Sequence, residues 1–221
     1  MEMNIEKKVL ISCELEEKET SLIVPDGVQT IAESAIAHNP FVKKIVLPAS
    51  VKSIRKEAFS GCLALRDLTI PAPATIRTQA FSGLPYEFFI SGKLTLIAAG
   101  GKADAEVPET FLSMGRTGLM GLKTLVVGEG IVRIGKRPMR YAFCTSVTLP
   151  ESLKELGEES LSYGDWRKIA IPRGVKRIEK RAFAGCRNLC EVCLSRETEV
   201  AEDAFENCPK VQFSYYEDEK A

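Results

Sequence analysis

Residues 47–71 read LPASVKSIRKEAFSGCLALRDLTIP, and the same pattern recurs along most of the chain. A new proline, Pro71, begins the next copy 23 residues after Pro48. A period of this length is typical of one coil of a solenoid, in which each repeat buries its apolar face against its neighbours. The sequence therefore predicts a stack of similar coils. The apolar positions of the repeat are Val51, Ile54, Ala58, Phe59, Cys62, Leu65, Leu68 and Ile70.

The quality of the repeat varies along the chain. The copy that begins at Pro172 is nearly ideal, whereas residues 85–145 are irregular and rich in glycine. Before the first copy, apolar runs at 9–11 and 22–24 flank a charged turn, which is typical of two short strands. We therefore expect three parts: an N-terminal entry hairpin or cap at 1–24, an array of about eight repeats at 25–213, and a C-terminal tail at 214–221.

The end of each repeat predicts a short strand with one buried face. In Leu68-Thr69-Ile70 apolar and polar residues alternate with the period of a strand. Such strands stack into a parallel sheet, and the proline that follows ends the pairing because it has no N–H. Ala-Phe and Gly-Cys pairs then form the opposite corner, where we expect short helical or 3-10 turns. The phenylalanines should line one interior column: Phe59, Phe81, Phe143, Phe183 and Phe205.

Composition excludes several classes of function. Lys plus Arg and Asp plus Glu each total 30, so no net charge favours nucleic acid. No apolar run approaches the ~20 residues that span a bilayer. The run before Cys13 covers only residues 9–11, whereas an export signal needs about 7–15 apolar residues. These features predict no membrane span and a cytoplasmic location, with a cell-surface location if the chain is a processed fragment.

Candidate chemistry is sparse. His38 is the only histidine, and no nucleophile can be placed beside it. Cys190 and Cys193 have C-x-x-C spacing, which leaves a thiolate metal or redox site open. The template favours structural thiols instead, because Cys186 occupies the same small, buried position as Cys62 in an earlier repeat. We predict no enzyme activity, no cofactor and no metal.

A disulfide between Cys186 and Cys208 is possible in the last two coils. Cys186 and Cys208 occupy neighbouring copies of the repeat. Their Cα atoms should therefore lie within the 4.4–6.8 Å range that disulfides use. Such a bridge requires an oxidising compartment.

The motif P-x-x-V-x-x-I-x-x-x-A-F-x-G-C-x-x-L-x-x-L-x-I resembles the BspA-type leucine-rich repeat of bacterial surface proteins. The resemblance covers about residues 25–213, and the segments VLISCELEEKETSLIVP and FFISGKLTLIAAGGKADAEVP are similar to one often found between repeats of that family. It implies a right-handed leucine-rich repeat solenoid with a parallel sheet on its concave face. It also implies a link to adhesion and protein binding. Surface members of the family carry an export signal, which is not recognisable here.

The concave sheet is the candidate binding face, because extended concave faces are what solenoids commonly use. We predict a non-enzymatic scaffold that binds a protein or peptide through this face. Two alternatives stay open, namely an exported surface adhesin or glycan-binding fragment and a cysteine-based metal or redox module. The tentative contacts are Lys44, Val46, Asp67, Thr69, Thr124, Val126, Ser146, Thr148, Lys168 and Glu191, and Ala170 and Cys193 share their outward orientation.

Overall fold

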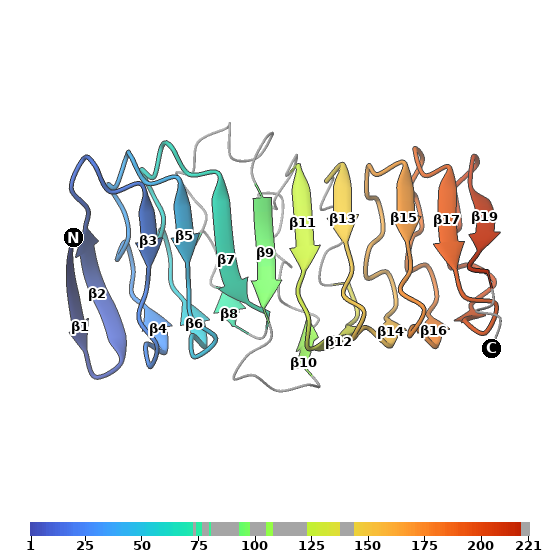
Figure 1. Cartoon of the computed structure of the whole chain (residues 1–221), viewed down its shortest axis with the longest axis horizontal. Coiled ribbons are helices and arrows are strands. Elements are labelled where there is room, and N and C mark those ends of the chain that lie inside the picture. The colour runs from blue at the N-terminus through green and yellow to red at the C-terminus, as the bar shows by residue number, and fades with distance from the viewer. Residues whose placement is uncertain are drawn as a thin grey trace.

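A computed structural model of the chain describes residues 1–72, 74–76, 80, 93–97, 105–107, 123–137 and 144–217. These residues form an elongated solenoid of stacked coils, with the N-terminus at one end and the C-terminus at the other (Figure 1). No helix in these ranges is long and apolar enough to cross a membrane.

The front sheets contain one strand from each coil, and neighbouring strands pair in parallel. They stand side by side along the molecule in Figure 1. The parallel sheet predicted from the repeat tails is therefore confirmed. One sheet comprises β3 (Ser21–Ile23), β5 (Lys44–Val46), β7 (Asp67–Pro71), β9 (Lys93–Ile97), β11 (Thr124–Val127) and β13 (Ser146–Thr148), and the other comprises β15 (Lys168–Ala170), β17 (Glu191–Leu194) and β19 (Gln212–Tyr215). Pro71 lies inside β7 rather than after it, opposite Ile97.

A second pair of sheets, the back sheets, was not anticipated from the sequence. Most of their strands are two residues long, too short for any alternation to be visible. They comprise β1 (Glu2–Glu6), β2 (Val9–Glu14), β4 (Thr30–Ile31), β6 (Ser53–Ile54) and β8 (Thr75–Ile76), followed by β10 (Ala105–Val107), β12 (Ile131–Ile134), β14 (Glu155–Leu156), β16 (Arg177–Ile178) and β18 (Glu199–Val200).

The N-terminal hairpin differs from the expected one. The two apolar runs do form strands, β2 and β3, but these strands lie in different sheets. The antiparallel partner of β2 is β1, whereas β3 pairs with β5. β1 was missed because its sequence, EMNIE, is mostly polar, and its residues are largely exposed. β2 pairs on its other side with β4 and so occupies the place of a back strand.

The interior is one continuous apolar core that runs from Leu10 to Cys208. Phe59 and Phe183 are fully buried in it. The ring of Phe183 stacks on that of Phe205, with centroids 5.0 Å apart and planes 3° from parallel. The expected phenylalanine column is thus confirmed for this pair, while Phe81 and Phe143 lie outside the described residues.

The corners are turns, and the expected helical or 3-10 segments do not occur in the described residues. The described corners instead contain left-handed backbone, which interrupts a helix. Residues with φ between 52° and 76° recur at two repeat positions. This geometry explains the glycine of the Gly-Cys pair, because glycine adopts positive φ without a side-chain penalty. The first position holds Ser34, Glu57, Arg137, Glu159 and Arg181, and the second holds His38, Gly61, Tyr163, Gly185 and Asn207.

Candidate functional site

The front face is the set of outward side chains on the front sheets. Strand register places these side chains in two rows that cross the sheets. Because neighbouring strands of one sheet lie about 4.8 Å apart, the side chains of each row are evenly spaced within each front sheet. One row holds Ser21, Lys44, Asp67, Thr124 and Ser146, then Lys168, Glu191 and Gln212; the other holds Ile23, Val46, Thr69, Thr95, Val126 and Thr148, then Ala170, Cys193 and Ser214.

The ten contacts predicted from the sequence all belong to these two rows. Lys44, Ser146, Thr148, Lys168 and Glu191 are exposed, and the other five are partly buried. The residues between them on the same strands point into the core: Ile45, Leu68, Leu125, Ile169 and Val192 are buried and Val147 is partly buried.

Sequence reasoning missed two members of the front face. Thr95 lies between Thr69 and Val126 in strand register. Its segment, FFISGKLTLIAAGGKADAEVP, was compared with a segment found between repeats of the family and not with a repeat strand. Ile23, with 64% of its surface exposed, extends the same row at the N-terminal end. An alternation of apolar and polar residues, Leu94-Thr95-Leu96, was the available signal for Thr95.

The second row is rich in β-branched side chains. Thr69, Thr95, Val126 and Thr148 are adjacent in register, and they offer methyl groups together with small hydroxyls. The first row is more polar and includes an ion pair between Lys168 and Glu191. The hydrogen bond to Glu191 raises the pKa of Lys168. Such a surface suits a ligand that lies across several strands.

The front face is hollowed where the two front sheets meet. β13 and β15 are not hydrogen-bonded as neighbouring strands. A depression of about 450 Å³ lies here, and its lining includes Ser146 and Lys168 from the two rows. Asn188 Nδ2 donates a hydrogen bond of 2.6 Å to Asp165 Oδ1 at the same place. The depression gives a partner polar groups to bind between β13 and β15.

The back of the C-terminal half carries three ladders of alternating charge, called here the ionic ladders. Within each ladder, residues recur every 22 positions, and the sign of the charge changes at each coil. The spacing was visible in the sequence but the pairing was not, because it depends on which coils are neighbours. The ladders are Arg133, Glu155, Arg177 and Glu199; Lys136, Glu158, Lys180 and Glu202; and Arg137, Glu159, Arg181 and Asp203.

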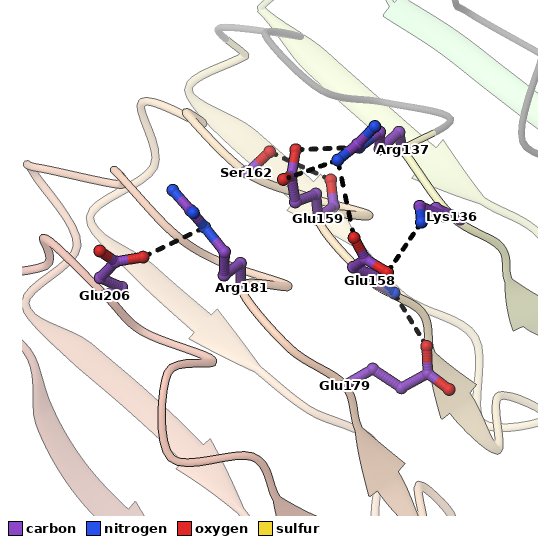
Figure 2. A network of polar contacts seen from close by, with 8 residues as sticks. All are labelled: Lys136, Arg137, Glu158, Glu159, Ser162, Glu179, Arg181 and Glu206. Carbon is purple, nitrogen blue, oxygen red and sulfur yellow. Dashed lines mark hydrogen bonds and ion pairs between the residues drawn. The ribbon is translucent and has the colours of Figure 1, made fainter.

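Ion pairs connect the coils within these ladders. Arg133 Nη2 lies 3.3 Å from Glu155 Oε1. Lys136 Nζ lies 2.9 Å from Glu158 Oε2 (Figure 2). The hydrogen bond from Lys136 holds the pKa of Glu158 below its usual range. The backbone N–H of Glu158 also donates to Glu179 Oε2 at 3.0 Å. The ladders therefore favour one stacking register of the C-terminal coils.

The Arg137–Glu159 pair is the most buried of these contacts. Arg137 Nε and Nη2 donate to the two carboxylate oxygens of Glu159 at 3.2 and 3.1 Å, in a bidentate arrangement (Figure 2). Glu159 is only 6% exposed. A buried carboxylate needs such partners, because removal from water is otherwise costly.

We expect Arg137→Gln to lower the free energy of unfolding by about 1–3 kcal/mol, because it removes the bidentate cation from buried Glu159. The matched control is Arg181→Gln. Arg181 has the same left-handed backbone but pairs at 3.1 Å with Glu206, which is exposed. Its loss should cost less than about 1 kcal/mol. Urea unfolding of both variants measures the difference, and equal losses would refute a special role for Glu159.

The cysteines are free thiols, and most are buried. Among the described residues, no group of three or more His, Cys, Asp or Glu side chains could hold a metal ion. Cys186 and Cys208 lie side by side on neighbouring coils, and their hydrogen bond raises the pKa of Cys186 and lowers that of Cys208. Burial raises the pKa of Cys13 to about 11 and the pKa values of Cys62 and Cys144 to about 12.

Stability should therefore fall as pH rises above about 9. A thiol whose pKa is raised from its ordinary 9.0 to about 12 by folding stays protonated in the folded state while it ionises in the unfolded chain. Its contribution is complete below pH 9 and is lost between pH 9 and about 12. We expect Cys62→Ala to flatten the decline between pH 8.5 and 10.5 in urea unfolding, and partly exposed Cys190→Ala to leave it unchanged. An equal decline in all three proteins would contradict this assignment.

Comparison with known proteins identifies the family. A family model for the BspA type leucine-rich repeat region matches residues 3–97 and 118–219 in six copies. The chain belongs to this family. A search of curated proteins found no match.

Crystal structures of other leucine-rich repeat proteins are similar to this BspA-type chain. A leucine-rich repeat protein from Bacteroides ovatus is 19% identical, with 97% of this chain and 69% of that chain covered and a TM-score of 0.42. A leucine rich cell surface protein from Faecalibacterium prausnitzii is 23% identical, with 92% and 61% covered and a TM-score of 0.41. The T. pallidum leucine-rich repeat protein is 19% identical, with 96% and 87% covered and a TM-score of 0.35.

Proposed function

We propose that this BspA-type repeat protein is a non-enzymatic scaffold that binds an extended segment of another protein across its front face. The observation that carries the proposal is the continuity of the β-branched row, in which small methyl and hydroxyl groups of Thr69, Thr95, Val126 and Thr148 follow one another at strand spacing. Repeat proteins commonly use extended faces of this kind for binding.

The composition of the face favours a polypeptide partner. A row of hydroxyls and methyls can accept both polar and apolar side chains, and the depression at Ser146 and Lys168 supplies a charged and a neutral polar group nearby. The large aromatic or arginine anchors of tight interfaces are missing from the two rows of described side chains. We therefore propose binding distributed over several strands, with moderate affinity.

Selection from a displayed library of random peptides tests the proposal. Peptides that bind the wild-type protein are measured against the double variant Thr69→Arg/Thr148→Arg, which places two bulky cations in the row. Affinity should fall at least about tenfold, a loss of about 1.4 kcal/mol. The control is Thr30→Arg/Ser53→Arg, whose positions lie on β4 and β6 of the back sheet. Binders that respond to the control and ignore the front-face variant would overturn the proposal.

A further inference from the structure

We propose a second interaction surface along the corner before the front strands, where an acidic segment of another protein that also carries apolar side chains binds across the coils. In Figure 1 this corner runs along the top, where the front strands begin. The surface, called here the basic rim, is defined by the cations directly before β5, β7, β11 and β15, which are Lys43, Arg66, Lys123 and Arg167. It borders the front face but consists of other side chains. Three observations carry the proposal: aligned positive charge, cations without carboxylate partners, and exposed apolar side chains beside them.

Backbone pairing places the residues before the front strands in one row. The N–H of Arg66 donates to Lys43 O at 2.9 Å, and the N–H of Cys190 donates to Arg167 O at 2.8 Å. Thr145 and Cys190 are uncharged members of the row, and the corner before β9 lies outside the described residues. β5 and β11 are three strand steps apart, or about 14 Å. A short extended segment can therefore contact several rim cations at once.

The positive charge of the rim is not neutralised within the described part of the chain. Lys43, Lys123 and Arg167 are exposed, and their side chains form no ion pair or hydrogen bond with the described residues. Arg66 Nη1 donates to a backbone carbonyl, Leu65 O, at 2.7 Å. In the ionic ladders, by contrast, cations pair with carboxylates of neighbouring coils. The rim therefore attracts carboxylates from a partner.

Nearby acids do not supply those carboxylates. Asp67 follows Arg66 but is partly buried. Asp165 accepts a hydrogen bond from Asn188, and Glu191 pairs with a lysine of the front face. One coil before Lys43 the equivalent turn is mostly acidic, with Glu16, Glu17 and Glu19. The rim therefore begins at Lys43.

Exposed apolar side chains accompany the cations at the N-terminal end of the rim. Phe41 and Leu63 are 47% and 58% exposed. The N–H of Ala64 donates to Pro40 O at 3.0 Å, so the two corners lie side by side on neighbouring coils. The other large apolar side chains that are exposed in the described residues belong to the first or last coils. A segment with both acidic and apolar residues matches this combination, whereas a polyanion without apolar groups leaves the two side chains uncovered.

A hollow continues the rim toward its C-terminal end. The depression of about 450 Å³ between β13 and β15 has Thr145 and Arg167 of the row in its lining. Lys168, the next residue, lines it as well. A carboxylate held in this depression would therefore face two cations.

A designed peptide tests the proposal on the full protein. The fluorescein-labelled probe has the sequence EFDELEDDEE, and its binding is followed by fluorescence anisotropy. Two control peptides are QFNQLQNNQQ, which has no charge, and EADEAEDDEE, which has no large apolar side chain. We expect saturable binding of the probe that weakens with salt. The uncharged peptide should bind at least about tenfold more weakly, and the alanine peptide about threefold to tenfold more weakly.

Protein variants locate the binding site on the rim. Lys43→Gln/Lys123→Gln/Arg167→Gln should weaken binding at least about tenfold at an unchanged melting temperature, because these side chains have no partner to lose in the described residues. The matched control removes the same net charge beside the back strands β6 and β14, where all three residues are exposed, and should weaken binding less than about twofold. This control is Lys52→Gln/Arg55→Gln/Lys154→Gln.

Further variants separate the apolar contacts and the front face. Phe41→Ala/Leu63→Ala should weaken binding of the probe about threefold to tenfold and leave the alanine peptide unaffected. Thr69→Arg/Thr148→Arg should not weaken binding, so failure of front-face binding and failure of rim binding are distinguishable.

Three results would overturn the proposal. The first is an absence of saturable binding up to about 1 mM. The second is equal weakening by the rim variant and its charge-matched control, which would show a response to net charge alone. The third is an oligothymidylate of equal charge that binds as tightly as the probe, which would make the rim a site for polyanions.

Discussion

Phe183→Ala is expected to lower the free energy of unfolding by about 3–5 kcal/mol, the range seen when a buried phenylalanine is truncated. The ring is fully buried and stacks on Phe205 in the next coil. Removal of the ring leaves a cavity between two coils. The cavity cannot collapse, because hydrogen-bonded strands on both sides hold the coils in place. Because the free energy of unfolding of a single domain is about 5–15 kcal/mol in total, this one change would remove a large share of the protein's stability.

The matched control is Phe41→Ala, because Phe41 is 47% exposed and lies on a corner of the same solenoid. We expect it to cost less than about 1 kcal/mol. Both variants are measured by urea unfolding with the fluorescence of Trp166, which is buried and is the only tryptophan. Similar losses for the two phenylalanines would mean that the column does not stabilise the stack.

Gly185→Ala is expected to destabilise the protein by about 2–5 kcal/mol. Gly185 has φ of +72°, where a side chain costs about 1–2 kcal/mol. An added Cβ would also lie 2.6 Å from ring atoms of Tyr163 in the neighbouring coil, and such overpacking costs a further ~1–3 kcal/mol. The steric contact arises because both residues occupy the same corner position of successive coils.

Gly27→Ala separates the cost of backbone strain from the cost of the steric contact. Gly27 has φ of +90°, but an added Cβ there would meet no atom within 4 Å. The free energy of unfolding of this control should therefore fall by only ~1–2 kcal/mol, which is the cost of backbone strain. The difference between the two variants in thermal or urea unfolding reports the contact with Tyr163. If Gly27→Ala proved the more damaging, close packing of the corners would be refuted.

Much of the fold could be predicted from the sequence because each coil buries apolar residues at the same repeat positions. The period located the front strands, and the alternation in segments such as Leu68-Thr69-Ile70 assigned their two faces correctly. The back strands were not predictable in the same way, because two residues such as Ser53 and Ile54 are too few to show a period. The turns were mistaken for helical ones because residues such as Glu57 and Arg181 give no compositional sign of a positive φ.

The candidate site was only partly predictable. Outward positions followed from strand alternation, so Thr69 and Thr148 could be named. Thr95 could not be placed in the same row, since its strand register depends on how an irregular segment joins the stack. The ionic ladders were hidden for a similar reason: Arg137 and Glu159 are 22 residues apart and meet only when their coils are neighbours. Which partner binds depends on the partner's own chemistry.

Photo-crosslinking tests front-face binding most directly. A benzophenone amino acid is placed at Thr69 or Thr148 on the front face, or at Ser53 on the back sheet, and each protein is irradiated with a peptide selected from the library. Binding across the front face predicts crosslinks from Thr69 and Thr148 and none from Ser53. Crosslinks from Ser53, with none from the two threonines, would contradict it.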